Sequence, residues 1–180
     1  MSITSLVSGA FKGRQTQIEA YAHNSEEIQQ HVLDNLISRG RSTQYGKTWG
    51  MDNVHGYEAF ANCMPIATYE ELKELIDRMR HGEENVLWPG RVRWFAKSSG
   101  TTNDKSKFIP VSPEGLRNVH YKGGTDAVAL YLRNNPQSRL FDGRSLILGG
   151  SHAPNYNVAH SLVGDLSAIL IENINPLANL

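Results

Sequence analysis

The sequence has 180 residues, which is enough for one domain with a substantial buried core. Its 18 basic and 18 acidic residues balance, so no basic excess favours nucleic acid and no acidic tail favours a disordered segment. Cys63 is the only cysteine in the sequence, which excludes a disulfide framework and a thiolate metal site.

The two ends of the sequence carry different signals. The N-terminus does not have the charged start and long apolar core of a signal peptide, and no apolar run is long enough to span a membrane. We therefore expect a cytoplasmic protein with no membrane partner. Residues 1–16 predict irregular structure or an entry helix. The apolar ending, residues 175–180, has no polar tail and indicates a cut through a longer protein.

A first amphipathic helix is predicted after Asn24, which can form a capping box with Glu27. Gly40 stands where a C-terminal cap would lie. The apolar positions that share one helical face are Ile28, Val32, Leu33, Leu36 and Ile37.

The next segment, residues 40–48, resembles a P-loop only superficially. It has five residues between its glycines where the motif has four, and a helix precedes it where the motif has a strand. We therefore interpret it as a loop between helices.

The second amphipathic helix follows a predicted helical turn at residues 57–61 and an extended link at Pro65. It runs from Thr68 to Arg80 and begins with a capping box formed by Thr68 and Glu71. Its predicted buried stripe is Leu72, Leu75, Ile76 and Met79, and its solvated face is Glu70, Lys73, Glu74 and Asp77.

A strand, a loop and a second strand are predicted over residues 91–111. Apolar runs lie on both sides of a loop that is rich in serine, threonine and lysine. Pro110 predicts that the second strand is short or lies at a sheet edge. Hydroxyl groups, a glycine that lets backbone amides approach a ligand, and a lysine at the loop exit are the features that a polyphosphate requires. The loop is therefore the candidate site.

The last third of the chain predicts two helices and a strand. Ser112 and Pro113 start a helix that runs to about Leu132. Its predicted inner positions are Leu116, Val119, Ala127, Leu130 and Tyr131, and Gly123 and Gly124 predict close packing against a neighbour.

Residues 144–148 predict a short buried strand. Residues 151–161 predict a polar loop whose histidines, His152 and His160, match no metal motif. Asp165 caps a final helix with Leu166, Ile169, Leu170 and Ile174 on one face.

The order Ser98-Ser99-Gly100-Thr101-Thr102, followed by Lys105-x-Lys107, resembles the first nucleotide-binding motif of the adenylate-forming enzymes. The loop length and the flanking residues 94–96 and 108–110 are more similar to one branch, the auxin-responsive acyl-acid amido synthetases with their bacterial relatives. Three further segments resemble that branch: Thr43-x-Tyr45-Gly46-Lys47, Pro65-Ile66-x-x-Tyr69-Glu70, and residues 82–90.

This resemblance implies an α/β fold, the N-terminal part of the large domain of an adenylate-forming enzyme, with a mixed sheet and packed helices. Residues 1–180 would form a single domain fragment, without the C-terminal part and the small closing domain. The full-length enzyme would use ATP and Mg²⁺ to adenylate a small carboxylic acid and would join it to an amino acid. The fragment alone would be inactive.

The resemblance assigns nucleotide-phosphate binding to Ser98, Ser99, Gly100, Thr101, Thr102, Lys105 and Lys107, with Lys107 as the first choice for the phosphate-contacting cation and Lys105 as the second. It implies no catalytic residue and no metal ligand in this part of the chain. Without the family pattern, the lysines would be interpreted as solvated surface charges. The loop has no nucleophile-elbow pattern, which argues against a serine nucleophile.

The sequence departs from the plant enzymes at Asn103, Asp104 and Ser106. An acidic Asp104 would repel phosphate unless Lys105, Lys107 or Mg²⁺ offsets it. This departure and the absent later motifs leave two alternatives open: a non-catalytic nucleotide- or phosphate-binding module, and a structural or interaction domain with a degenerate site. A truncated sheet also predicts self-association through unpaired strand edges.

Overall fold

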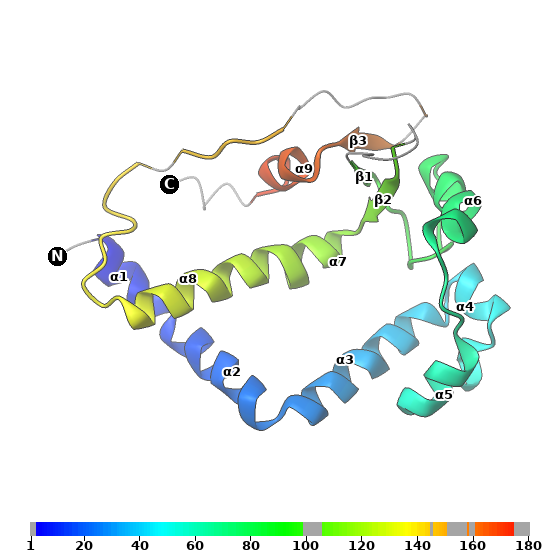
Figure 1. Ribbon diagram of the computed structural model, residues 1–180, viewed down its shortest axis with the longest axis horizontal. Helices are drawn as coiled ribbons and strands as arrows, with labels where there is room; N and C mark the ends of the chain where they lie inside the picture. The colour runs from blue at the N-terminus through cyan, green and yellow to red at the C-terminus, as the bar shows by residue number, and fades with distance from the viewer. Residues whose placement is uncertain (1–2, 99–105, 145, 151–157, 159–160, 175–180) are drawn as a thin grey trace. The chain divides into compact units, whose positions relative to one another are not determined.

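The computed structural model describes residues 3–98, 106–144, 146–150, 158 and 161–174. These residues belong to two compact units (Figure 1). The first unit contains residues 1–29 and 114–148, and the second contains residues 30–113 and 149–180. Each unit is therefore built from two separate stretches of the sequence.

The first unit is helical. Its elements are α1 (Ile3–Ala10), α2 (Lys12–His23), the start of α3 (Ser25–Gly40), most of α7 (Pro113–Gly115), the π-helical segment η2 (Leu116–Tyr121) and α8 (Lys122–Asn134). Arg14 on α2 donates two hydrogen bonds to the carboxylate of Asp126 on α8, at 2.5 and 2.7 Å. This pair raises the pKa of Arg14, chiefly through the side-chain hydrogen bond. Of the two predicted possibilities for residues 1–16, the helical one is confirmed in the described residues, where α1 and α2 are separated by a turn at Phe11.

A π-helical segment changes the face that the predicted 112–132 helix buries. Leu116 is buried as predicted, but Val119 and Tyr131 are 66% and 45% exposed, and Ala129 and Leu132 are buried in their place. The wider turns of a π segment rotate every later position relative to an α-helical count. The predicted close packing at Gly123 and Gly124 is also wrong in the described part of the chain, where nothing lies within 4 Å of a Cβ built at either residue.

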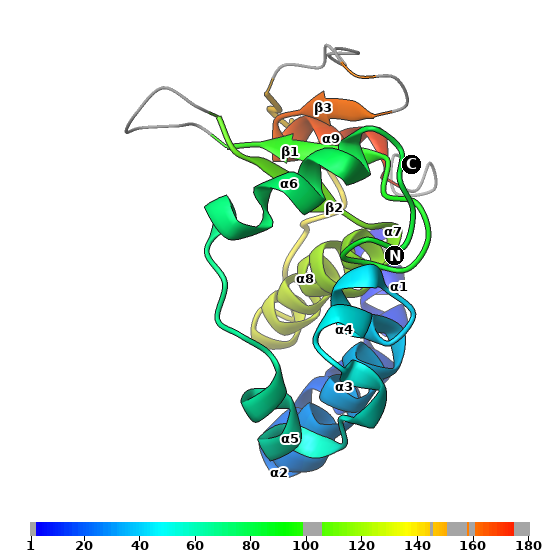
Figure 2. The same ribbon diagram turned by 90° about the vertical axis from the view of Figure 1, so that its right-hand side faces the viewer.

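The second unit holds a sheet and the helices that cover it. Its further elements are α4 (Gln44–Thr48), η1 (Met51–Asn53), α5 (Gly56–Cys63), α6 (Tyr69–Arg80), β1 (Trp94–Lys97), β2 (Phe108–Val111), β3 (Leu162–Gly164) and α9 (Leu166–Glu172). In the described part of the chain the strand order is β2-β1-β3. Figures 1 and 2 show α6 on one face of this sheet and α9 on the other. This mixed α/β arrangement confirms the predicted fold class.

The strand register gives the sheet both directions. β1 pairs antiparallel with β2, with Trp94 opposite Val111 and Lys97 opposite Phe108. β1 also pairs parallel with β3. The predicted order of strand, loop and strand is confirmed, and the antiparallel pairing makes it a hairpin. In the described sheet β2 with Pro110 lies at the edge, as expected. Self-association through the outer strands stays a prediction.

Among the described residues, two apolar clusters contribute to the core of the second unit. The larger cluster lies between α6, the sheet and the 82–92 segment, and its buried members are Ile76, Met79, Val86, Val92, Phe95 and Val163. The smaller cluster joins α3 to η1 and α5 through Ile37, Met51 and Val54. On α3, Val32 and Leu36 are about half exposed, so only part of the predicted apolar face is covered.

The start of α6 is as predicted. The Glu71 carboxylate accepts hydrogen bonds from the Thr68 backbone N–H at 2.6 Å and from the Thr68 hydroxyl at 2.7 Å. These two bonds lower the pKa of Glu71 and complete the capping box. The predicted stripe also faces the core, since Ile76 and Met79 are 5% and 2% exposed.

The 144–148 strand prediction is wrong. Leu146, Ile147 and Leu148 have no strand structure and are 85%, 63% and 84% exposed. The strand that joins β1 is instead Leu162–Gly164, which the sequence analysis did not predict. Both histidines of the predicted polar loop, His152 and His160, lie outside the described residues.

The segment that resembles a P-loop is a compact structural turn. Thr43 is the N-cap of α4: its hydroxyl accepts from Gly46 N–H at 2.9 Å and donates to the Gly40 carbonyl at 2.7 Å. A Cβ at Gly46 would lie 2.1 Å from the Gly40 oxygen, and a Cβ at Gly40 would lie 2.2 Å from the Met51 sulfur. Gly40 thus ends α3 where predicted, but it does not adopt the left-handed conformation of a C-terminal glycine cap, and it packs against the flexible Met51 side chain.

The Gly46→Ala substitution is expected to lower the free energy of unfolding by about 1–3 kcal/mol, because the added methyl group overlaps a backbone oxygen that cannot rotate away. The control is Gly123→Ala, which adds the same methyl group to a helix in open space and is expected to stabilise by about 0.5–1 kcal/mol. Urea unfolding measures both changes. Equal stability of Gly46→Ala and the unsubstituted protein would contradict the packing argument.

Candidate functional site

The predicted phosphate loop connects β1 to β2, and the structure describes its two ends. Ser98 follows β1 directly, and Lys107 precedes β2. The other predicted binding residues, Ser99, Gly100, Thr101, Thr102 and Lys105, lie outside the described residues. We therefore describe the geometry of the site at the neck of the hairpin, which we define as Ser98 and Lys107.

Ser98 and Lys107 close that neck. The Ser98 backbone N–H donates to the Lys107 carbonyl at 2.9 Å. The Lys107 N–H donates to the Ser98 hydroxyl oxygen at 3.2 Å, where a regular ladder would use a carbonyl. The serine side chain thus extends the strand pairing by one residue, and it fixes the point where the loop begins and ends.

The Lys107 side chain is exposed, and its ammonium faces an aromatic ring. Its Nζ lies 5.2 Å from the centroid of the Tyr69 ring, within the range of a cation–π interaction. Among the described residues no carboxylate forms an ion pair with Lys107.

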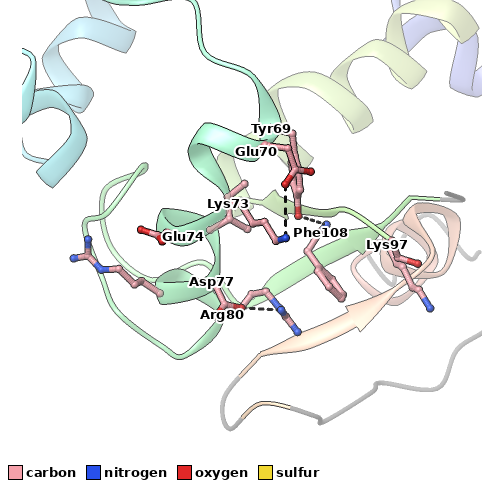
Figure 3. A pocket seen from close by; sticks show the side chains of 11 residues that line it. Tyr69, Glu70, Lys73, Glu74, Asp77, Arg80, Lys97 and Phe108 are labelled. Carbon is pink, nitrogen blue, oxygen red and sulfur yellow. Dashed lines mark hydrogen bonds and ion pairs between the residues drawn. The ribbon is translucent and has the colours of Figure 1, made fainter. Parts of the chain in front are cut away.

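An open groove of about 950 Å³ runs along α6 beside the neck (Figure 3). Residues of α6, the end of β1 and the start of β2 line it: Tyr69, Glu70, Lys73, Glu74, Ile76, Asp77, Arg78, Arg80, Lys97, Ser106 and Phe108. Its wall carries three carboxylates and four cationic side chains, so charges of both signs face the groove.

Four of these groove charges form two ion pairs within α6. Lys73 lies 3.6 Å from Glu70, and Arg80 donates to Asp77 at 2.9 Å. Both pairs are drawn as dashed lines in Figure 3. The guanidinium of Arg80 also lies 3.8 Å from the centroid of the Phe108 ring, which joins the end of α6 to β2. The interpretation of Glu70 as part of a solvated helix face is confirmed.

A further charged cluster fixes the end of α6 to α4. Arg78 donates to Glu83 at 2.5 Å and also donates to the side chain of Gln44. Gln44 in turn donates to Glu83 at 2.6 Å. The hydrogen bond from Arg78, followed by that from Gln44, lowers the pKa of Glu83 to about 2. These contacts give residues 82–90 a structural role beside α4.

Backbone hydrogen bonds add to that role. The Gln44 and Tyr45 amides donate to the carbonyls of Asn85 and Val86 at 2.7 and 3.1 Å. Asn85 adopts a left-handed conformation with φ of 56°, and its side chain accepts from Gly90 N–H at 2.8 Å. Two of the segments on which the resemblance rests are thus bonded to each other.

Tyr69 contacts the hairpin, and the sequence analysis did not predict this contact. Its hydroxyl accepts from Phe108 N–H at 2.9 Å, and its ring faces Lys107. Its place in the Pro65-Ile66-x-x-Tyr69-Glu70 segment was the available signal, but nothing in that spacing indicates a contact with a residue so far along the chain.

Two further classes of site were searched in the described part of the chain. There, no group of three histidine, cysteine, aspartate or glutamate side chains is arranged to hold a metal ion. The helices described are also too short or too polar to traverse a lipid bilayer.

Comparison with curated proteins finds plant amido synthetases. The chain is 32% identical over 100 residues to the indole-3-acetic acid-amido synthetase GH3.6 of Arabidopsis thaliana, covering 55% of this chain and 16% of that protein. It is 29% identical over 99 residues to the jasmonoyl–L-amino acid synthetase JAR6 of Nicotiana attenuata, covering 54% of this chain and 17% of that protein. The aligned region thus spans about a sixth of these relatives.

Solved structures show the same fold. The GH3.15 acyl acid amido synthetase superposes with a TM-score of 0.72 at 24% identity, over 88% of this chain and 28% of that one. A second structure, AtGH3.15 acyl acid amido synthetase in complex with 2,4-DB, gives a TM-score of 0.78 at 23% identity, over 90% and 28%. The model of the GH3 family N-terminal domain matches residues 14–176. The chain therefore belongs to the GH3 family and carries the N-terminal domain of that family.

Proposed function

We propose that this chain is part of an ATP-dependent acyl-acid amido synthetase and that the hairpin between β1 and β2 binds the ATP phosphates. The relatives named above are amido synthetases. The observation that carries the proposal is the neck of the hairpin, where Ser98 and Lys107 are hydrogen-bonded to each other and the Lys107 ammonium has no carboxylate partner among the described residues.

The proposed reaction has two steps. A carboxylate oxygen of the acid attacks the α-phosphorus of ATP and pyrophosphate leaves, giving an acyl-adenylate. The amine of an amino acid then attacks the acyl carbon, AMP leaves, and the nitrogen loses a proton as the amide forms. Negative charge develops on the phosphates in the first step, and fixed cations and hydrogen-bond donors stabilise it.

The residues of this chain have a binding role in the first step. Lys107 is the proposed phosphate-contacting cation, and Lys105 is the second candidate. Ser99, Thr101 and Thr102 would donate hydroxyl or backbone hydrogen bonds, and Gly100 would let the backbone approach the phosphates. Ser98 would donate through its hydroxyl, because its backbone N–H bonds to the Lys107 carbonyl.

Magnesium would reach this site as the Mg·ATP complex. Mg²⁺ in nucleotide sites is commonly held by substrate phosphates together with one or two carboxylates and water. The described residues contain no three-ligand cluster of their own, so they fit delivery of the ion by ATP better than a resident metal site. The amino acid and ATP substrates favour a cytoplasmic location, which is part of the proposal.

The experiment uses the full-length gene product and measures two quantities. Calorimetric titration with Mg·ATP tests phosphate binding, and release of pyrophosphate with a panel of carboxylic acids tests adenylation. Heat of binding together with acid-dependent pyrophosphate release supports the proposal. Binding without release would indicate a nucleotide-binding module without catalysis, and neither signal would reject both functions. The 180-residue chain alone is expected to release no pyrophosphate, because it aligns with only a sixth of its relatives.

A further inference from the structure

Tyr69 makes two contacts with the exit of the hairpin, one through each part of its side chain. The hydroxyl oxygen accepts a hydrogen bond from Phe108 N–H at 2.9 Å, drawn in Figure 3. The face of the ring lies 5.2 Å from the Lys107 ammonium. Two consecutive residues of the hairpin are thus held by one side chain from another element.

The hydrogen bond satisfies a donor that the sheet leaves open. Because Ser98 N–H bonds to the Lys107 carbonyl, the alternation of an antiparallel ladder turns the N–H of Phe108 away from β1. In the described sheet β2 is an edge strand, so this N–H has no strand beside it to accept the bond. The Tyr69 hydroxyl takes the place of a neighbouring carbonyl and fixes the start of β2.

Tyr69 is itself held on a rigid support. It is the first residue of α6, directly after the capping box that Thr68 forms with Glu71. Ile76 and Met79 anchor the same helix in the core, at 5% and 2% exposed. The position of the ring therefore follows from the packing of α6 and does not depend on the conformation of the loop.

We propose that Tyr69 is a positioning residue for Lys107, an inference that rests on the proposed function. The hydroxyl fixes the backbone from which the lysine side chain extends, and the ring holds the ammonium at the neck of the hairpin. A cation that is positioned before the nucleotide arrives loses less conformational entropy on binding. The contacts of Tyr69 thereby strengthen the proposed binding of the ATP phosphates by Lys107.

The test compares two variants of the full-length protein by titration with Mg·ATP and by steady-state kinetics. Tyr69→Phe removes only the hydroxyl, and Tyr69→Leu removes both contacts. We expect the Kd for Mg·ATP to rise about threefold in Tyr69→Phe and about tenfold in Tyr69→Leu. The KM for ATP should follow, and the KM for the carboxylic acid should stay unchanged. The matched controls are Tyr57→Phe and Tyr57→Leu, since Tyr57 is 69% exposed on α5 of the same unit.

A double-mutant cycle separates positioning from general destabilisation. If Tyr69 acts through Lys107, Tyr69→Leu should weaken ATP binding no further in a Lys107→Ala background. Additive losses, or equal rises in the KM for ATP and for the acid, would overturn the inference. So would Tyr69→Phe losing as much as Tyr69→Leu. A Lys107→Ala variant that binds Mg·ATP normally would reject the proposed function together with this inference, whereas a weakened Lys107→Ala beside an unaffected Tyr69→Leu would overturn the inference alone.

Discussion

Alanine at position 107 is expected to weaken Mg·ATP binding by about 10- to 100-fold, the loss typical of a charged hydrogen bond. Lys107 is exposed, and its backbone bonds to Ser98 do not involve the side chain, so the variant should keep its fold. Calorimetric titration of the full-length protein measures the change, and Lys107→Arg, which keeps the positive charge, should restore part of the affinity.

The control for this prediction is Lys47→Ala. Lys47 is exposed on α4, in the segment that resembles a P-loop, and the substitution removes the same charge from the same unit. It is expected to leave Mg·ATP binding unchanged, because Thr43 and Gly46 there form a compact turn. Loss of affinity in Lys47→Ala with no loss in Lys107→Ala would move the phosphate site from the hairpin to that turn.

Phe95→Ala is expected to cost the most stability of the substitutions considered, about 3–5 kcal/mol. Phe95 is 0% exposed on β1, the central strand of the described sheet, and belongs to the cluster that joins the sheet to α6. Removing the ring leaves a cavity that rigid neighbours on two elements cannot fill. Urea unfolding monitored by circular dichroism should show a lower midpoint.

Two further variants keep this prediction testable if Phe95→Ala does not fold. Phe95→Leu retains most of the apolar volume and should show a smaller loss in the same direction. Ile109→Ala removes an apolar side chain that is 45% exposed on β2 of the same hairpin, and it should change the unfolding midpoint little. A Phe95→Leu protein as stable as the unsubstituted one would show that this core tolerates the missing volume.

Local signals predicted much of the second unit. The capping box at Thr68 and the 3.6-residue spacing of the α6 stripe lie within one helix, and the two strands of the hairpin are close in the sequence. Each of these features is determined by neighbours along the chain. This is why the helix start, its buried face and the strand–loop–strand order were predicted correctly.

The wrong predictions concern features that neighbouring residues do not determine. These features are a strand partner far away in the sequence and a change of helical period. The three residues of β3 are a strand only because β1 lies beside them. The apolar run 146–148 reads as a buried strand, yet its side chains are exposed in the described chain. The π-helical turns at 116–121 rotate the following helix, and the spacing of the apolar residues does not predict this rotation.

The candidate site likewise has one part that was predicted from the sequence and one part that was not. Ser98 and Lys107 were predicted from the residue types of the loop and from the family resemblance, and the hydrogen bonds between them agree with their place at the two strand ends. The role of Tyr69 depends on how α6 packs beside β2. That information becomes available only when the helix and the hairpin are seen together.

The parallel pairing of β1 with β3 has a consequence for biosynthesis. The hairpin of β1 and β2 has low contact order and can form together with α6 as soon as residues 68–111 have left the ribosome. β3 belongs to the stretch that follows residues 114–148, which build the other unit. In the nascent chain, the edge of β1 that later pairs with β3 therefore stays unpaired while the ribosome synthesises residues 114–148. In that interval the strand is exposed to incorrect pairing and to chaperones.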